Sequence, residues 1–340
     1  MREEFHEYFK PTEAQIRGLW ANALFSFDAS VLLNVYGYSD DTCQDLVAFF
    51  EKFAERIRLP HQFGLEFSRN RASVIVRQVH NYLTAERELT KILKVHFLPK
   101  RDHPYLSEEA MTAFMGIQQE LADSRTEMER LLSEDVLCDR MLKTFEGKIG
   151  LQPTREEYEK LHKTAQDRYA AQIPPGYCDL KAKPVPQAYG DYIAWRQLIE
   201  IAKTEKRDII LAIDDEKEDW WQIEHERPVG PKPELLKEFA EESNQRVYLY
   251  NSFSFLRAAK LYGAADIEER VLREVESRLE SQREAKSAAA IKVVPSPVPF
   301  SEVKLDPLTS ERTAAEALKV APAASVEGES LKADAKEEGK

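Results

Sequence analysis

Short apolar runs and longer helical patterns alternate along the chain. Two apolar runs of strand length, 24–27 and 209–213, are each followed directly by an aspartate. Runs of this kind, apolar throughout and bounded by polar residues, are typical of buried parallel strands. Two further strands are predicted at 57–59 and 246–250, and helices at 41–56, 192–204, 234–242 and 252–259. The pattern therefore predicts an α/β fold with a central parallel sheet flanked by helices.

The segment between the second and third predicted strands has a helical pattern. Apolar residues recur at helical spacings over 61–97 and again over 114–145, and a polar stretch at 99–107 joins the two. This spacing predicts an antiparallel helical hairpin, followed by a third helix over 154–172. We expect these helices to form an insertion at about 68–172. Its simplest role is packing, and the alternatives are a wall that restricts the substrate or a surface for a homodimer.

The last predicted helix covers 265–283, and the composition changes beyond Glu284. The remainder is rich in alanine, proline, serine, glutamate and lysine, with few aromatic residues. It cannot bury enough apolar area to offset the entropy lost on ordering. We expect a folded domain over 1–262, a C-terminal helix over 263–284 and a disordered tail over 285–340.

Composition narrows the class of protein. The chain has 340 residues, of which 43% are hydrophobic, and a formal net charge of -12. Its apolar runs are much shorter than a membrane span, and its charged start lacks the apolar core of a secretory signal. Its three cysteines form neither a pairing pattern nor a zinc pattern, so we expect a cytoplasmic protein without disulfides. The negative charge argues against broad binding to long duplexes, so any nucleic-acid contact must be local.

The candidate chemistry lies in acidic residues at the edges of these segments: Asp28, Glu66, Asp191, Asp214 and Asp215. In open α/β sheets, ligands bind beyond the carboxyl ends of the strands, where Asp28 and Asp214 emerge. Carboxylates gathered there repel one another unless a divalent cation neutralises them. Oxygen ligands without clustered histidine or cysteine favour magnesium or manganese over zinc. The resulting hypothesis is metal-assisted hydrolysis of a phosphodiester bond.

Each acidic residue also has a simpler structural explanation. Asp28 and Asp191 stand where a cap of a turn or helix is expected. Glu66 can pair with Arg69 three residues on, and 214–219 can be a solvated acidic loop. The order and placement of the whole set, rather than any one member, favour a site.

The ordered motifs resemble those of a known family. The segments 27–34 and 59–71 resemble the PIN-like nucleases, and the resemblance spans roughly 20–262. Three further segments match the branch of that family with a long helical insertion, namely 174–179, 190–195 and 208–221. The resemblance implies a PIN-like fold whose acidic cluster holds one or two magnesium or manganese ions and cuts single-stranded RNA. The ions would lower the pKa of a water and neutralise the leaving oxygen, and one carboxylate would accept the proton.

Carried over residue by residue, the resemblance makes four acids catalytic: Asp28, Glu66, Asp191 and Asp215. Metal ligands are expected among the same four together with Asp214 and Asp219. Substrate contacts are expected at Ser30, Arg69, Arg71 and Lys217, of which the three cations could instead be counter-charges. The chain departs from many relatives at Ala29, Ser30 and Ile213, where threonine, asparagine and threonine are frequent. A serine hydroxyl can still orient a carboxylate or a water.

Two other functions fit the same residues. A catalytically silent PIN-like module would act through regulatory protein partners, and a metal-dependent phosphatase would act on small molecules in a closed pocket. The sequence contains no glycine-rich phosphate loop, serine-hydrolase motif or zinc-protease motif. The RNA and the biological setting, as a toxin, in phage defence or in RNA turnover, stay open at this point.

Overall fold

The computed structural model describes residues 1–97, 106–225, 227–263 and 265–293, and residues 1–286 form one compact unit. The helices are α1 (Glu13–Asn22), α2 (Ala29–Asn34), α3 (Asp40–Lys52), α4 (His61–Ile92), α5 (Glu108–Arg130), α6 (Val136–Phe145), α7 (Arg155–Ala170), α8 (Gly190–Glu205), α9 (Pro233–Ser243), α10 (Ser252–Leu261) and α11 (Glu269–Val293). The strands are β1 (Leu24–Phe27), β2 (Ile209–Ala212), β3 (Trp221–Glu224), β4 (Arg227–Pro231) and β5 (Val247–Tyr250). Short helical turns are η1 (His6–Tyr8), η2 (Val35–Gly37), η3 (Ala54–Arg56), η4 (Leu93–Phe97), η5 (Tyr177–Lys181) and η6 (Gln187–Tyr189).

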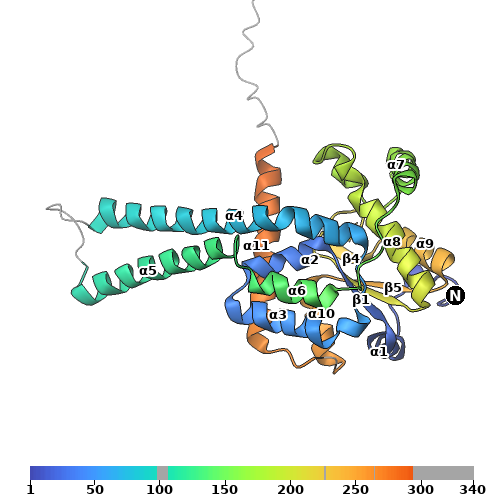
Figure 1. Ribbon diagram of the computed structural model, residues 1–340, viewed down its shortest axis with the longest axis horizontal. Helices are drawn as coiled ribbons and strands as arrows, with labels where there is room; N and C mark the ends of the chain where they lie inside the picture. Colours follow the sequence, from blue (N-terminus) through green and yellow to red (C-terminus); the bar gives the residue numbers. More distant parts are fainter. Residues whose placement is uncertain (98–105, 226, 264, 294–340) are drawn as a thin grey trace, which may run out of the picture. The chain divides into compact units, whose positions relative to one another are not determined.

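A parallel sheet in the strand order β1-β2-β5 forms the centre of this unit (Figure 1). The register pairs Phe27 with Ala212 and Ala212 with Tyr250, so the three strands end at the same edge. Every residue of β1 and β2 is buried, as expected for strands with helices on both faces. The predicted strand at 57–59 forms two isolated parallel bridges instead of a full strand: Ile57 pairs with Phe25 on β1, and Leu59 pairs with Ile149 in the segment after α6.

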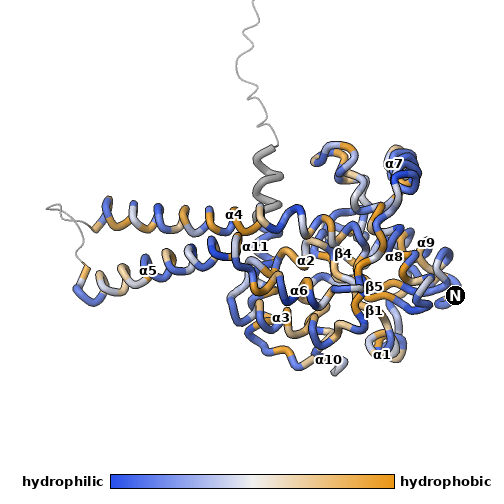
Figure 2. Tube along the Cα trace, viewed as in Figure 1, coloured by the Kyte–Doolittle hydropathy of each residue, from blue (hydrophilic) through white to orange (hydrophobic). Residues whose placement is uncertain are grey.

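Each face of the sheet has its own helical layer, because alternate strand residues point to opposite faces. Phe25, Phe27 and Ile210 pack in one apolar cluster with residues of α3, α6, α10 and α11. Leu24 and Leu211 pack in a second cluster with residues of α8 and α9. Figure 2 shows that hydrophobic residues are concentrated along β1 and β5, whereas α7 consists largely of hydrophilic residues. The predicted α/β fold with a central parallel sheet is confirmed.

The helices α4 and α5 form the antiparallel hairpin that the sequence predicts (Figure 1). The side-chain amide of Gln118 donates a hydrogen bond to the hydroxyl of Thr90 at 3.0 Å. Arg125 Nε donates to Glu86 at 2.9 Å, so later residues of α5 meet earlier residues of α4. The predicted seam over 114–145 is nevertheless divided between α5 and α6. Asp135 divides it, because its carboxylate accepts a hydrogen bond from the third amide of α6 and caps that helix.

Three further features differ from the sequence-based expectation. Two elements were not predicted. Helix α1 begins with a capping box formed by Thr12 and Gln15, and β3 and β4 form an antiparallel hairpin. Helix α11 continues to Val293, past the expected end of the folded part at Glu284. The predicted disorder of the tail concerns mainly residues 294–340, which lie outside the described residues. Within the described ranges, no helix combines the length and apolar character needed to cross a membrane.

Candidate metal centre

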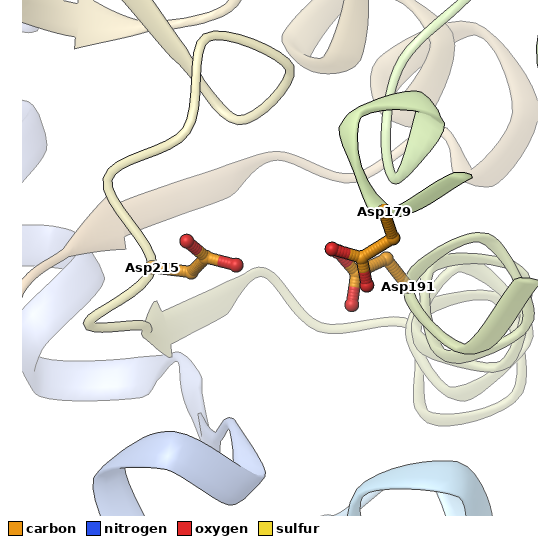
Figure 3. Close-up of side chains that lie close together, drawn as sticks. All are labelled: Asp179, Asp191 and Asp215. Carbon is orange, nitrogen blue, oxygen red and sulfur yellow. The ribbon is translucent and has the colours of Figure 1, made fainter. Parts of the chain in front are cut away.

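The carboxyl ends of β1 and β2 bring the residues that follow them to one edge of the sheet. The amide of Asp28 donates to the carbonyl of Ala212 at 2.9 Å. Beyond β2, Asp215 faces Asp179 and Asp191, and one carboxylate oxygen of each lies within 4.8 Å of the others (Figure 3). Asp179 is buried, whereas Asp191 and Asp215 are partly exposed. These three residues are called the acidic triad below.

Each member of the acidic triad comes from a different segment. Asp215 lies in the loop after β2, Asp191 in the first turn of α8 and Asp179 in η5. Trp220 Nε1 donates to the carboxylate of Asp191 at 3.2 Å. Trp221 Nε1 donates to the carbonyl of Asp215 at 2.7 Å. The two tryptophans that follow the acidic loop therefore hold two of the three acids in place.

Asp219 positions the segment that carries Asp179. Its carboxylate accepts hydrogen bonds from the amides of Gly176 at 3.0 Å and Cys178 at 2.9 Å. Burial raises the pKa of Asp219, and the hydrogen bond from the Cys178 amide opposes this rise. The second oxygen, Oδ1, is buried and has no hydrogen-bond partner among the residues that the structure describes. Because an unpaired buried oxygen is costly, this atom is available to a further donor or cation.

Two glycines allow the acids to approach one another. Gly176 has a φ of +94°, and a Cβ there would lie 2.0 Å from the Tyr169 hydroxyl and 2.8 Å from the Cβ of Asp191. A Cβ on Gly190 would lie 2.3 Å from Glu66 Oε1. Any larger residue at either position would push a predicted site acid away. The second contact also shows that Glu66 lies against the start of α8, next to Asp191.

Asp28 caps the first turn after β1. Its carboxylate accepts hydrogen bonds from the amide of Ser30, at 3.0 Å, and from the Ser30 hydroxyl. Burial raises the pKa of Asp28 to about 6. The Ser30 hydrogen bonds oppose this rise, while the charges of Glu66 and Asp215 add to it. Asp28 therefore lies within electrostatic reach of Glu66 and of Asp215 in the acidic triad.

Asp214 makes its hydrogen bonds within the protein. Its carboxylate accepts from the amide and the hydroxyl of Ser252, at 2.8 and 2.7 Å, and from Asn34 Nδ2 at 2.8 Å. Burial raises the pKa of Asp214, and these hydrogen bonds oppose the rise. In this arrangement Asp214 anchors the loop that carries Asp215. Its role as a metal ligand stays a prediction.

Two lysines reach the acidic triad. Lys217 Nζ contacts the carboxylates of both Asp179 and Asp215, the latter at 2.5 Å. Lys183 Nζ contacts the other oxygen of Asp179 at 2.5 Å. Burial alone lowers the pKa of Lys217, but the charges of Asp191 and Asp215 and the hydrogen bonds to Asp179 and Asp215 outweigh it and raise that pKa. The ammonium is therefore held in its charged form beside the acids.

The two predicted arginine contacts lie on α4. Arg71 Nη1 donates to the carbonyl of Leu131 at 3.1 Å and pairs with Asp135. The side chain of Arg69 is exposed. The substrate roles of both arginines stay predictions, and Arg71 already has partners within the protein.

The acidic triad fits a hard divalent cation. Magnesium binds oxygen at about 2.0–2.1 Å in an octahedron, so opposite ligands are separated by roughly 4 Å. The triad oxygens, within 4.8 Å of one another, need only a small adjustment to share one ion. The described cluster contains carboxylates alone, which favours magnesium or manganese over zinc. The Lys217 ammonium shows that the carboxylates accept a cation between them.

Of the four predicted catalytic acids, the structure brings Asp191 and Asp215 together and places Asp28 and Glu66 near them. The third member of the triad, Asp179, was not among the residues predicted from the sequence. The prediction relied on acids that follow a strand or lie in a long helix, and Asp179 does neither. The available signal was its position at the end of the segment 174–179, one of the motifs that carry the family resemblance.

Comparison with known proteins identifies the family of the chain. No curated protein and no solved structure matches the chain. A family model described as a PIN-like domain matches residues 24–235, which is more than half of the chain. The matched range contains the sheet edge, the helical hairpin and the whole acidic triad. The chain belongs to the PIN-like domain family.

Proposed function

We propose that this protein is a metal-dependent endoribonuclease that hydrolyses phosphodiester bonds of single-stranded RNA. The observation that carries the proposal is the acidic triad at the carboxyl edge of the sheet, within a PIN-like domain. Domains of this family are commonly metal-dependent nucleases, and three carboxylates in one site repel one another without a cation. Asp179, Asp191 and Asp215 are the proposed ligands of a magnesium or manganese ion.

The chain's own residues supply the remaining chemistry. A bound divalent ion would provide a water of lowered pKa and neutralise charge on the phosphate. Asp28, whose pKa is raised to about 6, is the proposed acceptor of the proton from the attacking water. Ser30 keeps the Asp28 carboxylate oriented. Glu66, which accepts a hydrogen bond from Gln62 at 2.6 Å, is a proposed further ligand beside α8.

RNA contacts are proposed at Arg69 and Lys217. Arg69 is exposed on α4, and Lys217 lies at the triad itself, so both can neutralise phosphate charge. A net charge of -12 disfavours the extended basic face that a duplex requires. The proposed substrate is therefore a short single-stranded stretch held close to the site.

The test is cleavage of a labelled single-stranded RNA with manganese, with EDTA, and with the variant Asp215→Asn. We expect cleavage by the wild-type protein with manganese only, and a loss of about a hundredfold or more in the variant. Asp167→Asn, which makes the same change at an exposed carboxylate on α7, should cleave normally. Wild-type rates for Asp215→Asn would exclude the acidic triad from the reaction.

One observation favours a second function, a catalytically silent module that binds regulatory protein partners. Lys217 and Lys183 already neutralise part of the acidic triad without a metal. Thermal unfolding with increasing manganese separates the two functions, because a ligand of the native state raises the melting temperature. An unchanged melting temperature, together with no cleavage, would favour the silent module.

We further propose a cytoplasmic location and a homodimer formed through the helical hairpin. Helix α5 has no buried residue over its described length, and Met115 and Ile117 on it are 62% and 50% exposed. A second copy packed against the hairpin would cover this apolar surface. Light scattering that finds a monomer at every concentration would contradict the homodimer.

A further inference from the structure

We propose that Lys217 is a built-in counter-cation that occupies the metal position of the acidic triad and must leave it when a divalent ion binds. The inference rests on the proposed metal centre and goes beyond it, because it makes metal binding an exchange of one cation for another. The protein would thus have a closed, lysine-neutralised state and an open, metal-bound state.

The position of the ammonium group is the first argument. Lys217 Nζ contacts Asp179 Oδ1 and Asp215 Oδ2 at the same time. These carboxylates are two of the three that offer oxygens within 4.8 Å of one another. The space between the carboxylates therefore holds either the ammonium or a divalent ion, and not both.

The backbone of Lys217 is fixed while its side chain has a way out. The carbonyl of Lys217 accepts hydrogen bonds from the amides of Trp220 at 3.1 Å and Trp221 at 3.0 Å. The side chain remains 31% exposed, on a flexible four-carbon stem. Rotation of the stem can move the ammonium into solvent without disturbing the turn that holds Asp215. No unfolding is needed for the exchange.

Lys183 provides a matched comparison within the same site. It contacts Asp179 through the other oxygen, Oδ2, and its side chain is 43% exposed. The structure shows an ion pair of Lys183 with Asp179, whereas Lys217 bridges two members of the triad. Removing Lys183 thus removes one positive charge beside the triad but leaves the position between the carboxylates occupied. Simple charge repulsion predicts that loss of either lysine tightens metal binding, in proportion to the carboxylates each one contacts, whereas occupancy predicts that the tightening is confined to Lys217.

The decisive experiment is titration calorimetry of manganese with the full chain as wild type, Lys217→Met and Lys183→Met. We expect Lys217→Met to bind manganese about tenfold more tightly than wild type or better, and Lys183→Met to change affinity by less than about threefold. Without metal, Lys217→Met should have the lowest melting temperature of the three, and manganese should raise it most. Equal tightening in both variants, or no tightening in Lys217→Met, would overturn the exchange.

The same titration separates this inference from the proposed function. If no variant binds manganese, the metal centre itself is wrong, and the exchange falls with it. If wild type binds and the two lysine variants behave alike, the metal centre stands and only the exchange is wrong.

A measurement on the wild-type protein tests the displacement of Lys217 even where a variant fails to fold. An amine-reactive label read out by mass spectrometry should modify Lys217 more in manganese than in EDTA, since the ammonium is released from its carboxylates. Labelling of Lys183 serves as the internal reference. Unchanged or reduced labelling of Lys217 on addition of manganese would contradict its displacement.

Discussion

The buried carboxylate of Asp28 makes the stability of the metal-free protein depend on pH. Burial raises its pKa from an ordinary value of 3.8 to about 6. The unfolded chain loses this proton near the ordinary value, whereas the folded chain keeps it until about pH 6. Folding stability therefore falls as the pH rises between the two values, and the full penalty persists above the higher one. Such a cost is typical of residues kept for chemistry rather than for stability.

We accordingly expect Asp28→Asn to stabilise the metal-free protein at pH 8 by roughly 2–3 kcal/mol, from about 1.4 kcal/mol for each unit of pKa shift. Asparagine is also a good cap, so the turn after β1 should be kept. Urea unfolding in EDTA at several pH values measures the gain, which should shrink as the pH falls and vanish below about 4. A gain that is the same at every pH would show that desolvation of the carboxylate is not its cause.

At the residue scale, the identity of the site acids is more predictable than their partners. Asp28 and Asp215 follow strands, and the geometry of a parallel sheet requires such residues to share one edge. Asp179 and Lys217 join the site through contacts made by loops and an irregular turn, which have no periodic signal in the sequence. The pairing of Lys217 with two acids is a tertiary contact that becomes visible only in the folded chain.

At the scale of the elements, one buried ion pair joins α4 to the start of α6. Asp135 accepts a hydrogen bond from the Tyr36 hydroxyl at 2.7 Å, pairs with Arg71, and caps α6. Its side chain is only 5% exposed. Breaking a buried pair by removing one partner leaves the other charge uncompensated. The contacts of Arg71 therefore favour a structural role over a role in substrate binding.

Arg71→Met should lower the free energy of unfolding by about 2–4 kcal/mol, while the remaining folded protein should cleave RNA at nearly the wild-type rate. Arg69→Met is the matched comparison, since this arginine is exposed two residues earlier on α4. That variant should keep its stability and raise the KM for RNA if Arg69 contacts phosphate. Urea unfolding combined with steady-state cleavage distinguishes the two arginines, and a stable but inactive Arg71→Met would restore its substrate role.

Periodicity predicts long elements better than it predicts their interruptions. The hairpin of α4 and α5 follows from the recurring apolar positions, but the break before α6 does not, because it depends on the partners of Asp135. The hairpin of β3 and β4 was not predicted, since β4 carries mostly exposed residues and two prolines. Local apolar patterning carries no signal for a hairpin of that kind.

At the scale of the whole molecule, α11 connects the C-terminal part of the folded unit to the candidate site. Arg283 pairs with Glu216 in the loop that follows β2, with Nε 2.7 Å from the carboxylate. Gln282 donates to Asn34 at 3.3 Å, and Asn34 in turn donates to Asp214. Helix α11 thus contacts the acidic loop directly at Glu216 and indirectly at Asp214. Its apolar face meanwhile packs in the core cluster on one face of the sheet.

This connection predicts that a change on α11 alters the metal site without unfolding the protein. Arg283→Ala removes a partly exposed pair, so the free energy of unfolding should change by less than about 1 kcal/mol. The loop that carries Asp215 loses an anchor, and manganese affinity should weaken by about threefold or more, since a mobile ligand must be ordered on binding. Arg270→Ala is the matched control, because Arg270 lies on the same helix but pairs with Asp45 on α3. Calorimetry with manganese should separate the two variants. Equal affinities would mean that the contacts of Asp214 and Trp221 hold the acidic loop without Arg283, and that α11 contributes to the core but not to the metal site.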